Sequence, residues 1–132
     1  MKKSIFLSII ILILTFWAIV DGFSKKAFSK HAVVESRYAH SWCLEHSGTS
    51  EVVFDDKTRC DCVTETNAIE FDFAPKFAES IGQSLMYAIH TNKRAGIVLI
   101  IEKPEDSYFF ERLQQIIEYH KLPIDIWRID VK

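Results

Sequence analysis

The sequence contains little glycine and proline: only four Gly and three Pro occur in 132 residues. Hydrophobic residues make up 48% of the chain, so enough apolar surface is present to offset the conformational entropy lost on folding. Collagen-like, low-complexity and disordered chains are therefore excluded. Glycine-rich loops that bind phosphates or dinucleotides are excluded too, because such loops need several glycines close together. We expect one small globular domain.

Positive charge is not in excess either. Sixteen Lys and Arg stand against eighteen Asp and Glu, a formal net charge of −2. Proteins that coat nucleic acid without sequence preference are strongly basic, because their affinity comes from many contacts to phosphate. That class is excluded, so a polyanionic partner must be bound by local cations. The candidates, each of which could equally be a solvated surface charge, are Lys57, Arg59, Lys93 and Arg94.

The start of the chain has the pattern of a targeting segment. Two lysines precede an apolar run over residues 5–20, as in a secretory signal peptide or an uncleaved anchor. A helix over this run would be about 24 Å long, short of a hydrocarbon core about 30 Å thick, which favours a signal peptide. No clear Ala-x-Ala cleavage site follows, which favours an anchor. We expect residues 1–22 to be a signal peptide or a membrane anchor. Residues 23–132 would then form a domain that is exported (periplasmic or secreted) or anchored to the membrane.

The rest of the chain predicts an α/β protein. The spacing of apolar residues predicts the order helix, three strands, helix, strand, helix, strand. Tight turns between the three consecutive strands predict an antiparallel meander. The later β-branched run predicts a central strand that is buried on both faces. The expected elements are a helix over 29–46, strands over 51–54, 59–64 and 68–73, a helix over 75–91, a strand over 96–101, a helix over 105–120 and a strand over 124–131.

Three carboxylates fall on two neighbouring strands. Glu70 and Asp72 share a face of one strand, and Asp61 lies on the strand before it, on the same face as Arg59. A charge buried between a sheet and a helix is costly unless it is paired or binds a metal. If the three carboxylates face one space, a divalent cation is the simplest way for all of them to stay ionised. The alternative is a sheet face open to water, which antiparallel sheets allow.

A polar stripe follows the helix expected after these strands. Its residues recur at steps of three and four, so they lie on one face of the helix. Two of them, Gln83 and Tyr87, are one turn apart and could bind phosphate or position a metal ligand. The stripe is either a solvated face or one wall of the carboxylate site. Its members are Lys76, Glu79, Gln83, Tyr87 and His90.

This order of residues resembles the PD-(D/E)XK nuclease superfamily. The matching features are an acid on the first helix (Glu35), Asp61 on one strand, Glu70 on the next, and Gln83 with Tyr87 on the following helix. The Gln-x-x-x-Tyr spacing is similar to that of the RecB-like branch. The resemblance covers nearly the whole domain. It implies a restriction-endonuclease-like αβββαβ core, here with an extra C-terminal helix and strand and preceded by an N-terminal hydrophobic helix.

The same resemblance implies hydrolysis of phosphodiester bonds in nucleic acid, with DNA favoured over RNA, by means of Mg²⁺ or Mn²⁺. No separate recognition domain fits in the chain, so sequence-specific cleavage would need a homodimer or another partner. The resemblance assigns the metal to Asp61 and Glu70, matches Glu35 to the helical acid of the family, and assigns accessory or substrate contacts to Gln83 and Tyr87. Asp72 or Glu35 would be a further metal ligand.

One position departs from the family pattern. A lysine normally follows two residues after the second acid, and this chain has Asp72 there. Lys76 could replace that lysine, because its flexible side chain could reach back over the strand end. Otherwise Lys76 pairs with Glu79 or is solvated. The expected catalytic residues are therefore Asp61, Glu70 and Lys76, and the alternative is a noncatalytic binding or assembly module with the same fold.

The three cysteines leave several interpretations open. They are too few for a disulfide scaffold, although an exported domain could form one bridge. Cys43, Cys60 and Cys62 could also bind zinc together with His46. We favour free buried thiols, because cysteine is a common core residue and Cys-x-Cys on a strand is a weak zinc signal. Strand alternation places Cys60 and Cys62 on one face, away from Asp61.

Overall fold

The computed structural model describes residues 12–13, 15–17 and 34–131. The chain divides into two compact units, Met1–Val34 and Glu35–Lys132. In the first unit, the few described residues are helical, and most of the expected targeting segment lies outside the described residues. No helix among the described residues has the length and hydrophobicity needed to cross a bilayer. The assignment of residues 1–22 as a signal peptide or an anchor stays a prediction.

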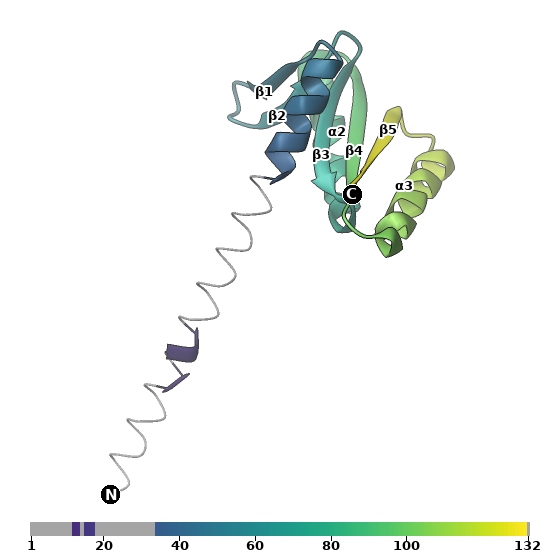
Figure 1. Cartoon of the computed structure of the whole chain (residues 1–132). Coiled ribbons are helices and arrows are strands. Elements are labelled where there is room, and N and C mark those ends of the chain that lie inside the picture. Colours follow the sequence, from purple (N-terminus) through teal and green to yellow (C-terminus); the bar gives the residue numbers. More distant parts are fainter. Residues whose placement is uncertain (1–11, 14, 18–33, 132) are drawn as a thin grey trace, which may run out of the picture. The chain divides into compact units, whose positions relative to one another are not determined.

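A five-stranded mixed sheet forms the second unit (Figure 1). The strands lie side by side in chain order. The first three are antiparallel to their neighbours, whereas the fourth is parallel to the third and the fifth is parallel to the fourth. The elements are a helix that includes residues 34–45, β1 (Thr49–Val53), β2 (Arg59–Val63), β3 (Asn67–Phe73), the 3₁₀ turn η1 (Ala74–Lys76), α2 (Phe77–Thr91), β4 (Arg94–Ile101), the 3₁₀ turn η2 (Pro104–Asp106), α3 (Ser107–His120) and β5 (Ile124–Asp130).

The predicted α/β class, order of elements and antiparallel meander are confirmed. The described strand and helix boundaries lie within a few residues of those expected. One detail of the sheet differs. β4 is buried and interior, as expected, but the middle strand of the five is β3, because the last strand adds beside β4.

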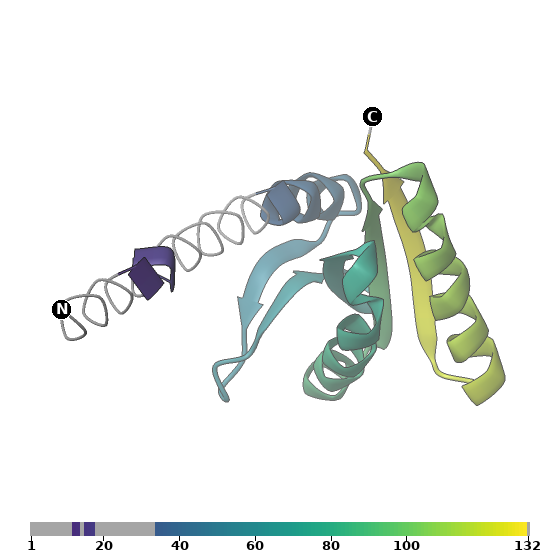
Figure 2. The same ribbon diagram turned by 90° about the horizontal axis from the view of Figure 1, so that it is seen from below.

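Helices cover both faces of the sheet. Alternation along β4 directs Ile97 and Leu99 toward α2 and α3, and Val98 toward the helix of residues 34–45. α3 runs alongside β5 in both views (Figures 1 and 2). The two largest core clusters are Ala74, Ala95, Ile97, Leu99, Ile101, Leu113 and Ile124 on one face, and Ala39, Cys43, Cys62, Ile69, Phe71 and Val98 on the other.

β2 and β3 diverge soon after they meet. Their paired positions are Cys62 opposite Ile69 and Val63 opposite Ala68. Beyond these, the Phe71 N–H donates to the carboxylate of Asp61 instead of to a carbonyl of the neighbouring strand, with an N···O distance of 2.9 Å. The β1–β2 hairpin leans away from the rest of the sheet (Figure 2). A side chain of β2 thus satisfies the backbone of β3 where the regular pairing stops.

This divergence also breaks the alternation along β2. Cys62 packs beneath the helix of residues 34–45, whereas Cys60 packs against Tyr87 of α2. The prediction that both cysteines share one face is therefore wrong, because the strand changes its orientation between them.

A disulfide joins Cys43 to Cys62. The expectation of free thiols is wrong for these two residues and holds for Cys60, which is buried and unbonded. The turn after the first helix passes close to this bridge: a Cβ added at Gly48 would lie 2.6 Å from the sulfur of Cys62. The zinc alternative fails because two of its four ligands are bonded to each other. Such a bridge is consistent with an oxidising, extracytoplasmic environment.

Candidate metal site

Carboxylates from three elements gather where β2 and β3 diverge. Glu70 and Asp72 lie on β3 and are only 6% and 3% exposed. Asp61 projects from β2, and Glu35 comes from the helix of residues 34–45. We call these four residues the carboxylate cluster. The charges of these acids raise one another's pKa values, so they lie within electrostatic reach of one another. The alternative of a sheet face open to water does not hold for the two acids of β3.

Glu70 is the least compensated member of the cluster. Burial raises its pKa to about 9, with further contributions from the charges of Asp61 and Asp72. Its Oε2 atom is buried and has no hydrogen-bond partner in the part of the chain described here. An unpaired buried oxygen typically costs about 1–3 kcal/mol. A proton or a cation would remove this cost.

Asp61 is held in place by the backbone of β3. Burial raises its pKa to about 6, although the hydrogen bond donated by the Phe71 N–H opposes this effect. The nearby charge of Glu51 on β1 raises the pKa further, and the charge of Arg59 lowers it. The carboxylate is therefore oriented before any ligand binds.

Lys76 faces the cluster and contacts Asp72. Its Nζ lies 3.1 Å from Asp72 Oδ1, with the lysine side chain 46% exposed. Burial works against the positive charge, but the hydrogen bond to Asp72 and the charges of Asp72 and Glu35 raise the lysine pKa. The side chain is therefore neither fully solvated nor paired with Glu79 alone, although the charge of Glu79 also raises its pKa. Its use as a replacement for the missing lysine stays a prediction.

Glu35 joins the cluster from the helix of residues 34–45. Burial raises its pKa to about 7, and the charges of Asp72 and Asp61 add to this effect. The positive charges of Lys76 and Arg59 oppose it. The helix of residues 34–45 thus brings its acid to the same space as the strands.

Gln83 and Tyr87 form the wall on α2. Tyr87 is 5% exposed and packs against Cys60 and Phe54. Burial raises the pKa of its hydroxyl, the charges of Glu70 and Asp61 raise it further, and a hydrogen bond with Gln83 opposes the shift. The hydroxyl of Tyr87 therefore keeps its proton next to the cluster.

Other predicted polar residues have structural partners elsewhere. His90, the last residue of the polar stripe, stacks on Phe54 and lies 3.0 Å from the carboxylate of Asp56. It fastens the β1–β2 turn to the end of α2. Lys93 donates to the carbonyl of Glu65.

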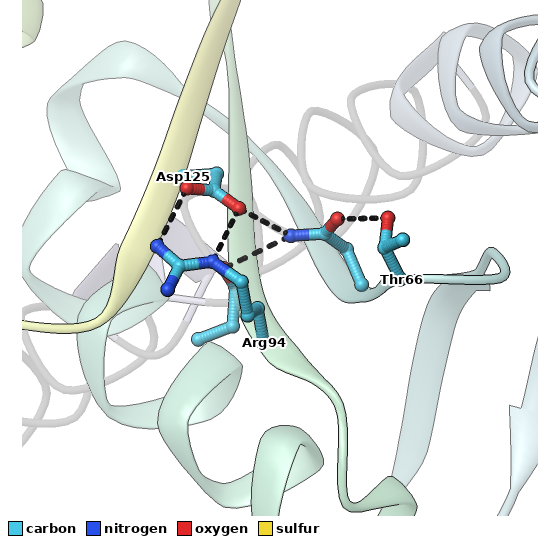
Figure 3. A network of polar contacts seen from close by, with 5 residues as sticks. Thr66, Arg94 and Asp125 are labelled. Carbon is cyan, nitrogen blue, oxygen red and sulfur yellow. Dashed lines mark hydrogen bonds and ion pairs between the residues drawn. The ribbon is translucent and has the colours of Figure 1, made fainter.

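Arg94 belongs to a network at the opposite end of β3 (Figure 3). It makes two hydrogen bonds of 2.9 and 2.8 Å to Asp125. The amide of Asn67 donates to the same carboxylate at 2.8 Å, and the hydroxyl of Thr66 donates to Asn67. Lys93 and Arg94 are therefore remote from the carboxylate cluster. Arg59, paired with Glu51, is the candidate phosphate contact that lies beside it.

The donor set fits a hard divalent cation. Mg²⁺ and Mn²⁺ prefer carboxylate oxygens, and Glu70 offers one that is buried and unpaired. Among the described residues, no group of three or more His, Cys, Asp or Glu side chains already lies close enough together to hold a metal ion. Like charges repel one another, so binding would require the carboxylates to close around the cation.

Comparison with protein-family models, with curated proteins and with solved structures finds no match to this chain. The function of the carboxylate cluster therefore has to be inferred from its own chemistry.

Proposed function

We propose that the domain is a divalent-metal-dependent nuclease of the PD-(D/E)XK type, exported or membrane-anchored, with Mg²⁺ or Mn²⁺ held by the carboxylate cluster. The observation that carries this proposal is the buried, unpaired oxygen of Glu70 beside Asp61 and Asp72. Acids that serve only stability are normally paired when they are buried. Strongly shifted pKa values grouped in one place are typical of functional sites.

The arrangement of elements supports the same proposal. A helix, three antiparallel strands, a helix and a parallel strand follow one another as in the αβββαβ core of that superfamily. The proposal is also supported by the elements that carry the acids, namely β2 for Asp61, β3 for Glu70 and the first helix for Glu35. α3 and β5 extend this core at its β4 edge.

Each residue has a definable task in phosphodiester hydrolysis. Asp61 and Glu70 would hold the cation, with Asp72 and Glu35 as further ligands. When bound, the cation would supply an activated water and neutralise charge on the scissile phosphate. The ammonium of Lys76, fixed by Asp72, would orient that water or stabilise negative charge on the phosphate. Tyr87 and Gln83 would donate hydrogen bonds to a ligand carboxylate or to the substrate.

The test uses the full-length protein with its disulfide intact. Binding of Mn²⁺ is measured by calorimetry, and cleavage of plasmid DNA, linear DNA and RNA is measured with Mg²⁺ or Mn²⁺. Replacing Glu70 with Gln should abolish metal binding and lower cleavage at least about 100-fold, because it removes the central ligand. The matched control is Glu118→Gln, on the exposed face of α3, which should change neither. A wild-type protein that binds no Mn²⁺ and cleaves none of the substrates would contradict the proposal.

A noncatalytic binding or assembly module is the second candidate. It is favoured by one observation: Asp72 holds Lys76 in an ion pair, so this lysine already has a structural partner. Lys76→Ala distinguishes the two candidates. In a nuclease this change lowers cleavage while Mn²⁺ binding persists, whereas a module would bind ligand without cleavage in either form.

A further inference from the structure

An ion pair on the β1–β2 hairpin lies beside the carboxylate cluster. Arg59 Nη1 is 2.7 Å from Glu51 Oε2, and the two side chains are 59% and 45% exposed. β1 and β2 pair Val52 with Cys60 and Val53 with Arg59, so Glu51 reaches the position opposite Asp61. Arg59 is two residues from Asp61 on the same strand, about 6.6 Å along it. The ion pair therefore borders the cluster on its solvent side.

The backbone at Glu51 is specialised. Its φ is 58°, in the left-handed region that residues other than glycine seldom adopt. β1 pairs regularly with β2 on both sides of this residue, at Ser50 and at Val52. Glu51 thus interrupts the regular ladder, and its carboxylate meets the guanidinium of Arg59.

Exposure makes this pair easy to exchange. Solvent-exposed ion pairs contribute only about 0–1 kcal/mol to stability, so a competing anion displaces one partner at little cost. A phosphodiester offers a guanidinium the same geometry as a carboxylate, namely two oxygens that accept parallel hydrogen bonds. Arg94 makes a bidentate contact with Asp125, which also accepts a hydrogen bond from the buried Asn67, so Arg94 is less free to exchange its partner.

We propose that Arg59 binds a phosphate group of the substrate beside the metal site, and that Glu51 occupies this phosphate subsite when no substrate is bound. This inference rests on the proposed nuclease function. It assigns Glu51 the role of an internal competitor. The negative charge of Glu51 also repels the phosphate backbone of the substrate, which adds to the competition. Glu51 lies close enough to Asp61 to raise its pKa. The inference accounts for the presence of Arg59, a second cation besides Lys76, at the edge of a cluster of four acids.

Binding of a fluorescein-labelled DNA single strand, followed by anisotropy in Ca²⁺ over a series of salt concentrations, tests the proposal in the full-length protein. Arg59→Ala should weaken binding about tenfold, as expected for loss of a hydrogen bond to a charged group. It should also reduce the slope of log K against log salt by about 0.7, the value for one phosphate contact on a single strand. Arg59→Lys should recover most of the slope and only part of the affinity, because it keeps the charge and loses the bidentate contact.

Glu51→Gln separates this role from a purely structural pair. If Glu51 competes with phosphate, this variant should bind the DNA severalfold more tightly than wild type. A pair that only fastens the hairpin predicts equal loss of stability in both variants and no gain in affinity. Arg112→Ala on the exposed side of α3 is the matched control and should leave affinity and slope unchanged.

The outcomes distinguish this inference from the proposed function. If the wild-type protein binds Mn²⁺ and cleaves nucleic acid, but Arg59→Ala leaves the DNA affinity and the salt slope unchanged, only the inference is overturned. Absence of Mn²⁺ binding and cleavage would overturn the nuclease proposal, and the inference of a phosphate subsite beside the metal site would be overturned with it. A wild-type protein that does not bind the DNA strand would overturn the inference.

Discussion

At its first residue β3 buries Asn67, and in its second half it buries Glu70 and Asp72. The polar groups at the first end have partners, and we call Thr66, Asn67, Arg94 and Asp125 the Asn67 network. The Asn67 amide donates to Asp125 and to the carbonyl of Ala95, its oxygen accepts from Thr66, and Arg94 balances the charge of Asp125. Around the second half of the strand, the four acids of the carboxylate cluster lie within electrostatic reach of one another, and Lys76 and Arg59 carry the opposing charges.

The difference separates a stabilising network from the proposed functional site along a single strand. A matched network lowers the energy of the folded state by itself, because every buried donor and acceptor has a partner. An excess of buried negative charge raises that energy, and it persists only where the rest of the fold supports it. The carboxylate cluster should therefore respond to substitution, to pH and to cations in the opposite sense to the Asn67 network.

Removing the disulfide should lower stability more than any of the substitutions below, and it should also affect the carboxylate cluster. Cys43–Cys62 ties the helix that carries Glu35 to the strand that carries Asp61, with a sequence separation of 19. Reduction adds two electrons and two protons and gives two thiols. It should destabilise the domain by about 3 kcal/mol, the value for a loop of this size, and weaken Mn²⁺ binding. Guanidinium denaturation and calorimetry with and without a phosphine reductant measure both effects.

The control for this prediction is the double variant Cys43→Ala, Cys62→Ala, in which the reductant should change neither stability nor Mn²⁺ binding. Cys60 does not complicate the result, because burial raises its thiol pKa to about 12 and leaves it a poor nucleophile. If reduction lowers the free energy of unfolding by less than about 0.5 kcal/mol and leaves Mn²⁺ binding unchanged, the bridge supports neither the fold nor the site.

Glu70→Gln should stabilise the metal-free protein while it destroys the metal site. The folded-state pKa of Glu70, about 9, exceeds the ordinary value of 4.5. The contribution of this carboxyl to the free energy of unfolding is therefore fully present below about pH 4.5. It is lost as pH rises through about 9. At pH 8 the glutamine variant should be about 2 kcal/mol more stable than wild type, a gain limited by the unpaired amide that replaces the carboxylate.

Urea denaturation from pH 5 to pH 9 checks this second prediction. Wild-type stability should fall toward alkaline pH, and Mn²⁺ should oppose the fall, because it binds the ionised carboxylates. In Glu70→Gln the pH slope should be smaller and Mn²⁺ should have no effect. A glutamine variant that is less stable than wild type at pH 8 would show that Glu70 has a stabilising partner.

Much of this architecture could be predicted from local pattern. Helical and strand periodicities predicted each main helix and strand, because most apolar residues lie on the buried face of one helix or strand. The grouping of Asp61 with Glu70 followed from their places on neighbouring strands. The contact of Lys76 with Asp72 is local, because the two residues are four positions apart at the end of β3, whereas the catalytic role of Lys76 stays a prediction.

The contacts that define the site more finely were not predictable in this way. Alternation assumes a continuous ladder, so it could not show that β2 turns between Cys60 and Cys62 where the strands diverge. The Asn67 network joins residues up to 58 positions apart and has no periodic signal. The spacing of Glu51 and Arg59 suggested neither the hairpin ion pair nor its place beside Asp61.

Asp125→Asn should give the smallest effect, with the opposite sign to Glu70→Gln. The hydrogen bond from Arg94 lowers the pKa of Asp125 below its ordinary value of 3.8, so its contribution is present above that pH and is lost as pH falls through the lower folded-state value. The pair is partly exposed, and asparagine can still accept the hydrogen bond from Asn67. A loss of about 1 kcal/mol at pH 7 is therefore expected.

The control for Asp125 lies on the same strand. Asp130 pairs with Arg128, but neither contacts a buried amide, so Asp130→Asn should change stability by less than about 0.5 kcal/mol. Both variants should bind Mn²⁺ like wild type, because the Asn67 network and the carboxylate cluster occupy different ends of β3. If Asp125→Asn weakened Mn²⁺ binding as strongly as it lowered stability, the two ends would be coupled. The separation of a stabilising end from a functional end would then fail.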